Sequence, residues 1–490
     1  MGQVATAPLV LAVDLGTTGV RALVVDATGA QRAEVYREVL PSHPAPGLVE
    51  HELEPIVDAT VAVIGAALAQ VPAGAVRGIG VTTQRSTAAI WEARSGRGVH
   101  AALSWQDGRT ATRCAALMAD GFFVTPLMAA TKIEWLLDRV DPERRRVHAG
   151  ELRCGTLDAW FLWRLSGGTI SATDASNAST TGLYAPFEER GWDARLLGAL
   201  RIPIDALPAI RDSSGVLGEL DPALGLPRLP IAAVIGDQQA AMMGQLRTEP
   251  GETKITYGTA AMIDLNAGAT PLFSSQGAYP LALWQRDGQV TWCLEGTAIT
   301  AGAAVTWLRD GLGMITDPDE TGPLAASVPD SGGVWVIPAF QGLGTPYMDT
   351  TARAVVGGLS RAPTRAHIVR ALLDGIAWRC REVYDALRAD CPHAAPTVLR
   401  VDGGAARNDV LLQAQADALG IAVERPAVIQ ASALGAAYLA GLATGVWDST
   451  DELRATWRCA RRFEPQLDAR VREERFAAWR AHVDAARTRS

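Results

Sequence analysis

Apolar runs separated by glycine turns dominate the start of the chain. Leu9–Asp14 and Val20–Asp26 are apolar and are joined by Leu15–Gly19, so they are expected to form two buried strands around a tight turn. Ala27–Ala30 turns the chain again toward Glu34–Leu40. The pattern therefore predicts a β-meander whose first turn is rich in glycine and hydroxyl groups.

A similar layout begins again in the second half. After a Pro/Gly break at Thr248–Gly251, Thr253–Tyr257 and Ala260–Leu265 read as strands around the turn Gly258–Thr259. Further strands are predicted at Arg77–Thr83, Leu229–Ile235 and Val398–Asp402, and helices at Thr300–Leu312, Arg365–Leu387, Asn408–Leu419 and Ser432–Leu442. We expect two α/β domains of related design, 1–248 and 249–447, followed by a helical tail at 448–490.

Length and composition agree with two globular domains. A chain of 490 residues exceeds the ~250–300 residues at which single cores stop growing, and its 48% hydrophobic and 20% charged content is ordinary. Apolar runs stay below the ~18–20 residues that span a bilayer, so no membrane partner is expected. A net charge of −8 argues against nucleic acid as a binding partner. Six cysteines without CxxC spacing favour a cytoplasmic location.

Lysine is scarce, and its scarcity excludes several nucleotide-binding folds. The chain has only Lys132 and Lys254, and each is followed by isoleucine. A P-loop needs lysine followed by serine or threonine after glycines, so it is absent. The lysine context and His-Arg-Asp loop of protein kinases are missing as well. Gly342-Leu-Gly344 continues as Thr-Pro-Tyr, which does not match the dinucleotide-binding glycine motif.

The first glycine turn has the parts of a phosphate-binding loop. Gly16 permits the sharp turn, the hydroxyls of Thr17 and Thr18 add donors, and Asp14 is a candidate Mg²⁺ partner. Such a turn alone is more often a plain hairpin. Two further glycine loops follow apolar strands, at Tyr257–Thr259 and Asp402–Ala405. Their number favours an anionic, phosphate-bearing ligand.

Three side chains are candidates for acceptor chemistry, each with an ordinary alternative. Asp237 follows the strand Leu229–Ile235 and opens a helical pattern, so it is either a general base or an N-cap. The guanidinium group of Arg85 either donates hydrogen bonds to substrate hydroxyls or forms an ion pair at the surface. Trp105 is either an apolar wall for a carbon skeleton or a core residue. Periodicity alone leaves these alternatives open.

Several motifs together resemble the FGGY carbohydrate kinases, and within that family the glycerol kinases. These motifs are Asp14-Leu-Gly-Thr-Thr-Gly-Val-Arg21, Thr83-Gln-Arg85, Trp105-Gln-Asp-Gly-Arg109, Gly236-Asp-Gln-Gln-Ala240, Tyr257-Gly-Thr259, Gly344-Thr-Pro-Tyr347 with Ala352-Arg353, Val401-Asp-Gly-Gly-Ala405 with Asn408, and Ala433-Leu-Gly-Ala-Ala-Tyr-Leu-Ala-Gly441. They occur in order, with compatible spacing, from about residue 9 to about residue 447. The resemblance implies an α/β, actin-like ATPase (ribonuclease H-like) fold with two related domains around a deep cleft.

The resemblance also implies an activity, cofactors and a set of site residues. The reaction would be ATP-dependent phosphorylation of a hydroxyl of a small polyol or sugar, with ATP and Mg²⁺ as cofactors and Asp237 as the catalytic base. The acceptor would be bound by Arg85, Ser86, Trp105, Asp237 and Gln238. The nucleotide would be bound by Thr17, Thr18, Arg21, Thr259, Gly302, Thr306, Gly404, Ala405 and Asn408, and the metal by Asp14. Relatives are often dimers or tetramers, so a homo-oligomer is expected.

Two positions depart from the glycerol kinase pattern. Ser86 stands where glycerol kinases typically have glutamate, and Leu127 where they usually have tyrosine. Losing both groups would weaken glycerol binding by roughly ten- to a hundredfold. The alternatives are therefore a kinase of another polyol or ketose, such as erythritol, a pentitol or xylulose. Two alternatives belong to other functional classes. One is a nucleotide-driven ATPase of the same fold that is not a kinase, and the other is a non-catalytic sugar sensor.

Overall fold

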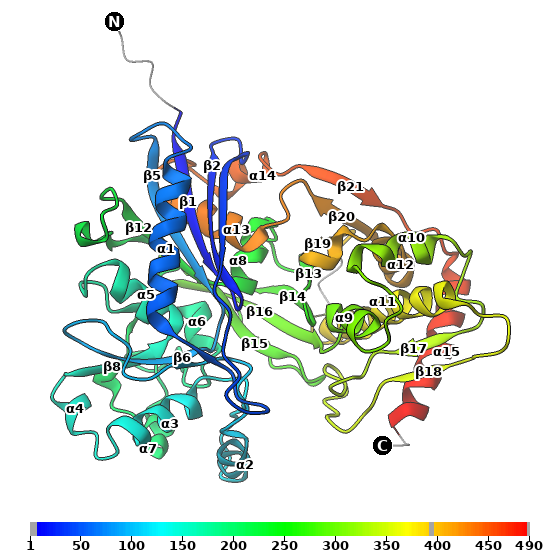
Figure 1. Cartoon of the computed structure of the whole chain (residues 1–490), viewed down its shortest axis with the longest axis horizontal. Coiled ribbons are helices and arrows are strands. Elements are labelled where there is room, and N and C mark those ends of the chain that lie inside the picture. The colour runs from blue at the N-terminus through cyan, green and yellow to red at the C-terminus, as the bar shows by residue number, and fades with distance from the viewer. Residues whose placement is uncertain (1–6, 392–395, 488–490) are drawn as a thin grey trace, which may run out of the picture. The chain divides into compact units, whose positions relative to one another are not determined.

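The computed structural model describes residues 7–391 and 396–487, which form two compact units (Figure 1). The first unit takes in the chain up to Leu246, together with Ala282–Val290 and Ser432–Thr456. The second unit takes in Arg247–Leu281, Thr291–Ala431 and the chain from Trp457 onward. The units are therefore interleaved in sequence. The consecutive segments 1–248, 249–447 and 448–490 remain a functional division that we propose.

A six-stranded mixed sheet forms the centre of the first unit, in the order β11-β12-β5-β1-β2-β3. Its strands are β1 (Leu9–Leu15), β2 (Gly19–Asp26), β3 (Gln31–Glu38), β5 (Val76–Thr83), β11 (Ser214–Glu219) and β12 (Pro230–Gly236). β1, β2 and β3 are antiparallel neighbours, whereas β1, β5 and β12 run parallel. The carboxyl ends of these three parallel strands therefore lie at one edge of the sheet.

Helices pack against this sheet. α1 (Leu53–Leu68) packs against β2 and β3 (blue in Figure 1). α13 (Ala431–Ala443) approaches so closely that a Cβ on Gly80 of β5 would lie 2.1 Å from the Ala436 carbonyl oxygen. The small residues of the 433–441 motif thus permit close packing. The remaining helices are α2 (Ala111–Ala119), α3 (Ala130–Val140), α4 (Arg145–His148), α5 (Leu157–Leu165), α6 (Ala175–Ser179), α7 (Ala194–Leu200), α8 (Asp237–Gly244) and α14 (Thr450–Arg454).

Smaller sheets complete the first unit. One has the order β4-β7-β6-β8 and the other pairs β10 with β9. Their strands are β4 (Glu50–His51), β6 (Ala88–Glu92), β7 (Ala102–Leu103), β8 (Leu152–Thr156), β9 (Ala172–Asp174) and β10 (Ala209–Arg211), and short 3₁₀ helices lie at Ile204–Ala206 and Pro222–Leu224. The unit has its own apolar core, which includes Leu11, Val13 and Val81.

The second unit repeats the spatial order of these strands, with the additional strand β15 beyond β16. Its seven-stranded sheet has the order β15-β16-β14-β13-β19-β20-β21, in which β13 pairs antiparallel with β14 and parallel with β19. The strands are β13 (Thr253–Tyr257), β14 (Ala261–Gly268), β15 (Tyr279–Arg286), β16 (Gln289–Ala298), β19 (Val398–Asp402), β20 (Ala422–Pro426) and β21 (Cys459–Phe463). β13, β14, β16, β19 and β20 thus correspond in order to β1, β2, β3, β5 and β12. This is the predicted actin-like, ribonuclease H-like fold of two related α/β domains.

The second unit also contains five α-helices within the described residues, and α9, α10, α11 and α12 contribute residues to one cavity. They are α9 (Gly302–Asp310), α10 (Thr321–Ala326), α11 (Arg365–Asp390), α12 (Asp409–Leu419) and α15 (Ala469–Arg487), with short 3₁₀ helices at Pro318–Glu320 and Gly404–Arg407. β17 (Trp335–Ile337) and β18 (Val355–Gly357) form a separate ribbon. None of the helices in 7–391 and 396–487 is both long and apolar enough to cross a membrane.

The C-terminal segment differs from the predicted helical tail. α14 and α15 are helices, but β21 lies between them and pairs antiparallel with β20. β21 has the sequence Cys-Ala-Arg-Arg-Phe, and only Phe463 in it is buried. An edge strand exposes most of its side chains, so charged residues are tolerated there and the strand resembles the exposed face of a helix in sequence.

Candidate active site

Three candidate polar groups lie at the carboxyl ends of neighbouring parallel strands in the first unit. In register, Leu15 of β1 is beside Thr83 of β5, and Thr83 is beside Gly236 of β12. Asp14 precedes the first of these positions, Gln84 and Arg85 follow the second, and Asp237 follows the third. The parallel register therefore gathers residues that are more than 200 positions apart in sequence.

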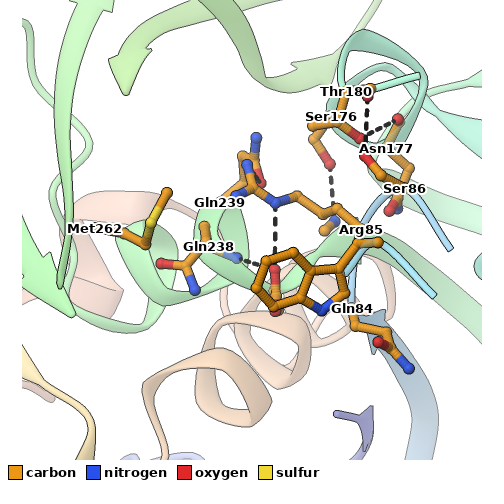
Figure 2. A network of polar contacts seen from close by, with 12 residues as sticks. Gln84, Arg85, Ser86, Ser176, Asn177, Thr180, Gln238, Gln239 and Met262 are labelled. Carbon is orange, nitrogen blue, oxygen red and sulfur yellow. Dashed lines mark hydrogen bonds and ion pairs between the residues drawn. The ribbon is translucent and has the colours of Figure 1, made fainter. Parts of the chain in front are cut away.

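Arg85 and Asp237 form the centre of this group. The Arg85 Nε lies 3.4 Å from Asp237 Oδ1, and Arg85 Nη1 donates to Gln239 Oε1 at 3.4 Å (Figure 2). Arg85 is held close to the main chain, because a Cβ on Gly236 would lie 2.9 Å from its Cγ and Cδ. Glycine at position 236 thus leaves the space that the arginine side chain occupies. Arg85 is half of an ion pair, but its partner is the candidate base.

Asp237 is the first residue of α8, and the cap position is Gly236. Its Oδ1 accepts the amide hydrogen of Gln238 at 2.8 Å, while the Asp237 carbonyl accepts from the Ser432 hydroxyl at 3.0 Å. The side chain remains 27% exposed. The N-cap alternative for Asp237 is therefore wrong, because Gly236 occupies that position and no side chain caps the helix, while the Asp237 carboxylate remains partly exposed to a ligand.

Asp14 is the second carboxylate of the site. Burial, and after it the nearby Asp237 carboxylate, raise the pKa of Asp14, Arg21 lowers it, and the resulting pKa is about 7. Two carboxylates that repel each other favour a bound cation between or beside them. No cluster of three or more His, Cys, Asp or Glu side chains suited to a metal exists among the described residues. Mg²⁺ binds through one or two carboxylates plus substrate phosphates and water, so this donor set fits Mg²⁺.

Trp105 is half-buried and is tied to the first glycine turn. Its Nε1 donates to Thr17 Oγ1 at 3.2 Å, and the Thr17 hydroxyl donates to Gln84 Oε1 at 3.2 Å. The Trp105 carbonyl accepts from Lys132 Nζ at 3.1 Å. Lys132 is fully buried, and burial lowers its pKa to about 7. Lys132, one of the two lysines of the chain, thus fixes the main chain of Trp105, the residue expected to contact the carbon skeleton of the acceptor.

Thr18 and Arg21 lie beside the turn but are engaged with β3. The Thr18 carbonyl accepts from the Tyr36 hydroxyl at 3.1 Å, and Arg21 forms an ion pair with Glu34. Arg21 is also the cross-strand neighbour of Asp14. Arg21 would therefore have to share its charge between Glu34 and a bound phosphate.

Ser86 and Leu127 are the two positions that depart from the glycerol kinase pattern. Ser86 is buried, has a left-handed backbone with φ of 60°, and donates its hydroxyl hydrogen to the Thr180 carbonyl at 2.9 Å (Figure 2). Leu127 is 52% exposed. The Ser86 hydroxyl is therefore directed to main chain, and Leu127 supplies no polar group.

The six nucleotide-binding candidates of the second unit all line one cavity of about 950 Å³. They are Thr259, Gly302, Thr306, Gly404, Ala405 and Asn408. Val305, Leu373, Ile376 and Leu411 contribute apolar walls. A cavity of this size with apolar walls and polar main chain at its rim suits a flat heterocycle joined to a polar sugar.

Two glycine turns meet at this cavity because their strands are in register. Thr256 of β13 pairs with Asp402 of β19, and the Thr256 hydroxyl donates to Asp402 Oδ1 at 2.6 Å. Gly403 has φ of 87°, and a Cβ there would lie 2.4 Å from the Tyr257 carbonyl oxygen. The Gly258 carbonyl in turn accepts from the Gly302 amide at 2.9 Å. Only glycine allows this close approach of the turns.

Asn408 uses its side chain to connect helices around the cavity. Its Oδ1 caps α12 by accepting from the amides of Val410 and Leu411 at 3.0 and 3.2 Å, and its Nδ2 donates to Thr321 Oγ1 at 3.0 Å. Asn408 thus joins α12 to α10. Its expected contact with adenosine is compatible with this position, since it also lines the cavity.

Several polar residues that support or line these two sites were not predicted from the sequence. Ser176 of α6 contacts the Gly236 amide beside Asp237, Asn177 follows it in the same helix, and Asp319 and Thr321 line the cavity of the second unit. α6 has five residues, which is too short for a periodic pattern. Residues 317–322 are mostly polar and match none of the motifs above. Only the rarity of lysine could have drawn attention to Lys132.

Comparisons with known proteins agree on one family. The family model for the N-terminal domain of the FGGY family of carbohydrate kinases matches residues 9–244, and the model for its C-terminal domain matches residues 253–444. A protein named glycerol kinase from Rhodospirillum centenum is 44% identical, with 99% of this chain and 98% of that protein covered. Another glycerol kinase, from Dechloromonas aromatica, is 43% identical over 97% of each chain.

Solved structures of carbohydrate and polyol kinases are also similar to this chain. Plasmodium falciparum glycerol kinase, solved with ADP, is similar with a TM-score of 0.90 and 28% identity, covering 98% of each chain. A xylulose kinase from Rhodospirillum rubrum is similar with a TM-score of 0.82 and 26% identity, covering 97% of this chain and 98% of that one. The resemblance therefore extends over nearly the whole chain.

Proposed function

This chain belongs to the FGGY family of carbohydrate kinases, and we propose that it transfers the terminal phosphoryl group of ATP to glycerol, giving glycerol 3-phosphate and ADP. The observation that carries the proposal is the Arg85–Asp237 pair at the ends of β5 and β12. The glycerol kinases that share more than 40% identity over nearly their whole length support glycerol as the acceptor.

Asp237 acts as the general base in this proposal. As a hydroxyl oxygen of glycerol bonds to the terminal phosphorus of ATP, the bond from that phosphorus to the bridging oxygen breaks, and the hydroxyl proton passes to Asp237. Proton removal by a placed carboxylate typically contributes ~10²–10⁴-fold to the rate. Arg85 and Gln238 donate to the other hydroxyls and orient the acceptor, while the indole of Trp105 faces its carbon skeleton.

The second unit binds the nucleotide in this proposal. Adenosine occupies the cavity lined by Gly404, Ala405 and Asn408, and the turn at Thr259 with the start of α9 binds phosphate through main-chain amides. Thr17 and Thr18 donate to the outer phosphates. Mg²⁺ would be held by Asp14, with Asp237 nearby, and when bound it neutralises charge on the phosphates.

An acceptor screen tests the proposal. ADP release would be followed with ATP, Mg²⁺ and each of glycerol, dihydroxyacetone, erythritol, ribitol and xylulose, with a control lacking acceptor. Preferential turnover of glycerol supports the proposed reaction. ADP release that needs no acceptor and survives Asp237→Asn would instead favour a nucleotide-driven ATPase that is not a kinase.

A second acceptor class is favoured by one specific observation. Ser86 directs its hydroxyl to the Thr180 carbonyl and Leu127 is apolar, so two groups that typically hold glycerol are absent from this chain. A pocket with fewer polar contacts suits a larger or less hydroxylated polyol, or a ketose. In the same screen, a kcat/KM for erythritol, a pentitol or xylulose above that for glycerol would establish this alternative.

Two further expectations remain part of the proposal. The resemblance to relatives that are dimers or tetramers supports a homo-oligomer, which sedimentation velocity would detect. Six dispersed cysteines, five of them buried, support a reducing compartment such as the cytoplasm. Fractionation with the native host would check the location.

A further inference from the structure

The short helix α6 lies where β12 loses one of its neighbours. Alternate amides of a strand point to the same side, so the amides of Val234 and Gly236 both face away from β5. The Val234 amide donates to the main-chain carbonyl of Ser213 at 3.2 Å. The Gly236 amide instead donates to a side chain, the hydroxyl of Ser176, at 2.8 Å (Figure 2). Gly236 immediately precedes Asp237.

The direction of the Ser176 hydroxyl is determined by a buried carboxylate. Ser176 Oγ lies 2.9 Å from Asp174 Oδ1, and an ionised carboxylate only accepts hydrogen bonds. The Ser176 hydroxyl hydrogen therefore points to Asp174, which leaves its lone pairs for the Gly236 amide. Asp174 itself is fully buried and also accepts from the amides of Ser176 and Asn177 and from the Ser213 hydroxyl.

We propose that Ser176 is a positioning residue for Asp237, holding the last amide of β12 so that the carboxylate stays beside Arg85. The inference rests on the proposed role of Asp237 as the base. Ser176 does not touch the carboxylate itself; it acts through the main chain of Gly236. The same helix reaches the end of β5, since the carbonyl of Thr180, which follows α6, accepts from the Ser86 hydroxyl at 2.9 Å. α6 thus connects the two strand ends that carry Arg85 and Asp237.

Ser213 offers a matched control. Its hydroxyl is also fully buried and donates to the same carboxylate, to Asp174 Oδ2 at 2.6 Å, but it makes no contact with the Gly236 amide. Removing either hydroxyl deprives Asp174 of one hydrogen bond inside the protein. Removal of the Ser176 hydroxyl also takes the acceptor from the Gly236 amide, whereas removal of the Ser213 hydroxyl takes it from the Gln285 amide, which is remote in sequence from Asp237.

The experiment compares Ser176→Ala, Ser176→Thr and Ser213→Ala in the full-length enzyme. We expect Ser176→Ala to lower kcat about tenfold with KM for ATP unchanged, and Ser176→Thr, which keeps the hydroxyl, to recover most of the rate. Ser213→Ala is expected to keep kcat within about twofold of wild type. Its melting temperature should fall by about as much as that of Ser176→Ala. Equal kcat in Ser176→Ala and Ser213→Ala would overturn the inference.

Two additions keep the outcome interpretable. If Ser176→Ala does not fold, Ser176→Cys keeps the volume and supplies a weaker acceptor, so it should still lower kcat several-fold more than Ser213→Ala does. Asp237→Asn separates the two proposals. If that variant keeps the wild-type rate, the proposed base is wrong. If it is inactive while Ser176→Ala behaves like Ser213→Ala, only the positioning role is wrong.

Discussion

The Arg85 guanidinium lies against the Asp237 carboxylate, with Nε 3.4 Å from Oδ1, although 151 residues separate them in the sequence. The parallel pairing of β5 and β12 produces this contact, because Thr83 and Gly236 are in register at the ends of their strands. A cationic fork beside a carboxylate can hold the hydroxyls of an acceptor while one of them loses its proton.

Asp14 should make the stability of the protein depend on pH. Burial raises its pKa from 3.8 to about 7, so the folded protein binds the proton more tightly than the unfolded chain does. The stabilisation is complete below pH 3.8 and is lost as the pH rises through about 7. Asp14→Asn removes this dependence.

Thermal unfolding of both proteins between pH 5 and pH 8 would measure the effect. The melting temperature of Asp14→Asn relative to wild type should rise with pH up to about 7 and then level off. A difference that stays constant over this range would show that Asp14 is not protonated at an unusually high pH.

Gly302→Ala should weaken nucleotide binding. An added Cβ would lie 2.6 Å from the Gly258 carbonyl oxygen, which is too close for the start of α9 to keep its contact with the 258–259 turn. We expect about a tenfold loss of ADP affinity, corresponding to about 1.4 kcal/mol, by calorimetry. Gly198→Ala is the control, because an added Cβ in α7 meets no atom within 4 Å apart from its chain neighbours and the backbone of its own helix. Similar ADP affinity in the two variants would contradict the role of this turn.

Ser86→Glu should improve the use of glycerol. A carboxylate at this position adds acceptors for glycerol hydroxyls, and we expect KM for glycerol to fall by about threefold to tenfold with KM for ATP unchanged. Ser86→Ala serves as the comparison, since it removes only the bond to Thr180. An unchanged KM for glycerol in Ser86→Glu would mean that position 86 does not contact the acceptor.

Lys254→Met should destabilise the second unit. The Lys254 ammonium is fully buried and donates to Asp264 Oδ2 and Thr256 Oγ1, both at 2.7 Å. Losing it leaves a buried carboxylate without its counter-ion, which typically costs about 3–5 kcal/mol of unfolding free energy. Urea denaturation would measure the loss.

The double variant Lys254→Met/Asp264→Leu tests the cause of that loss. It replaces both charges with apolar groups, so much of the stability should return. Arg309→Ala, which breaks an ion pair at the surface, should leave the denaturation curve nearly unchanged. If the double variant is no more stable than Lys254→Met, the unpaired Asp264 charge is not the reason for the loss.

Much of the fold was predictable because its central strands are continuous apolar runs. The predicted strands Thr253–Tyr257 and Val398–Asp402 match β13 and β19, and the predicted helix Arg365–Leu387 agrees with α11 to within three residues. Strands buried on both faces leave a strong signal in sequence. β21 was missed because an edge strand needs few buried residues, and Arg461 and Arg462 are compatible with an exposed helix face.

The candidate site was predictable where a motif coincides with a strand end. Asp14, Arg85 and Asp237 each lie where an apolar strand stops, so parallel pairing could be expected to gather them. The support behind them was not predictable. Ser176 and Asp174 lie in a short polar segment, and their contact with Gly236 depends on the path of the chain around β12. Hydrogen bonds of this kind have no sequence period.

The most direct test of the account is the rate of ADP release from Asp237→Asn with ATP, Mg²⁺ and glycerol. Asparagine keeps the shape of the side chain but cannot accept the proton, so kcat should fall by ~10²–10⁴-fold while ADP affinity and the melting temperature stay close to wild type. Turnover at the wild-type rate in that variant would contradict the assignment of Asp237 as the base.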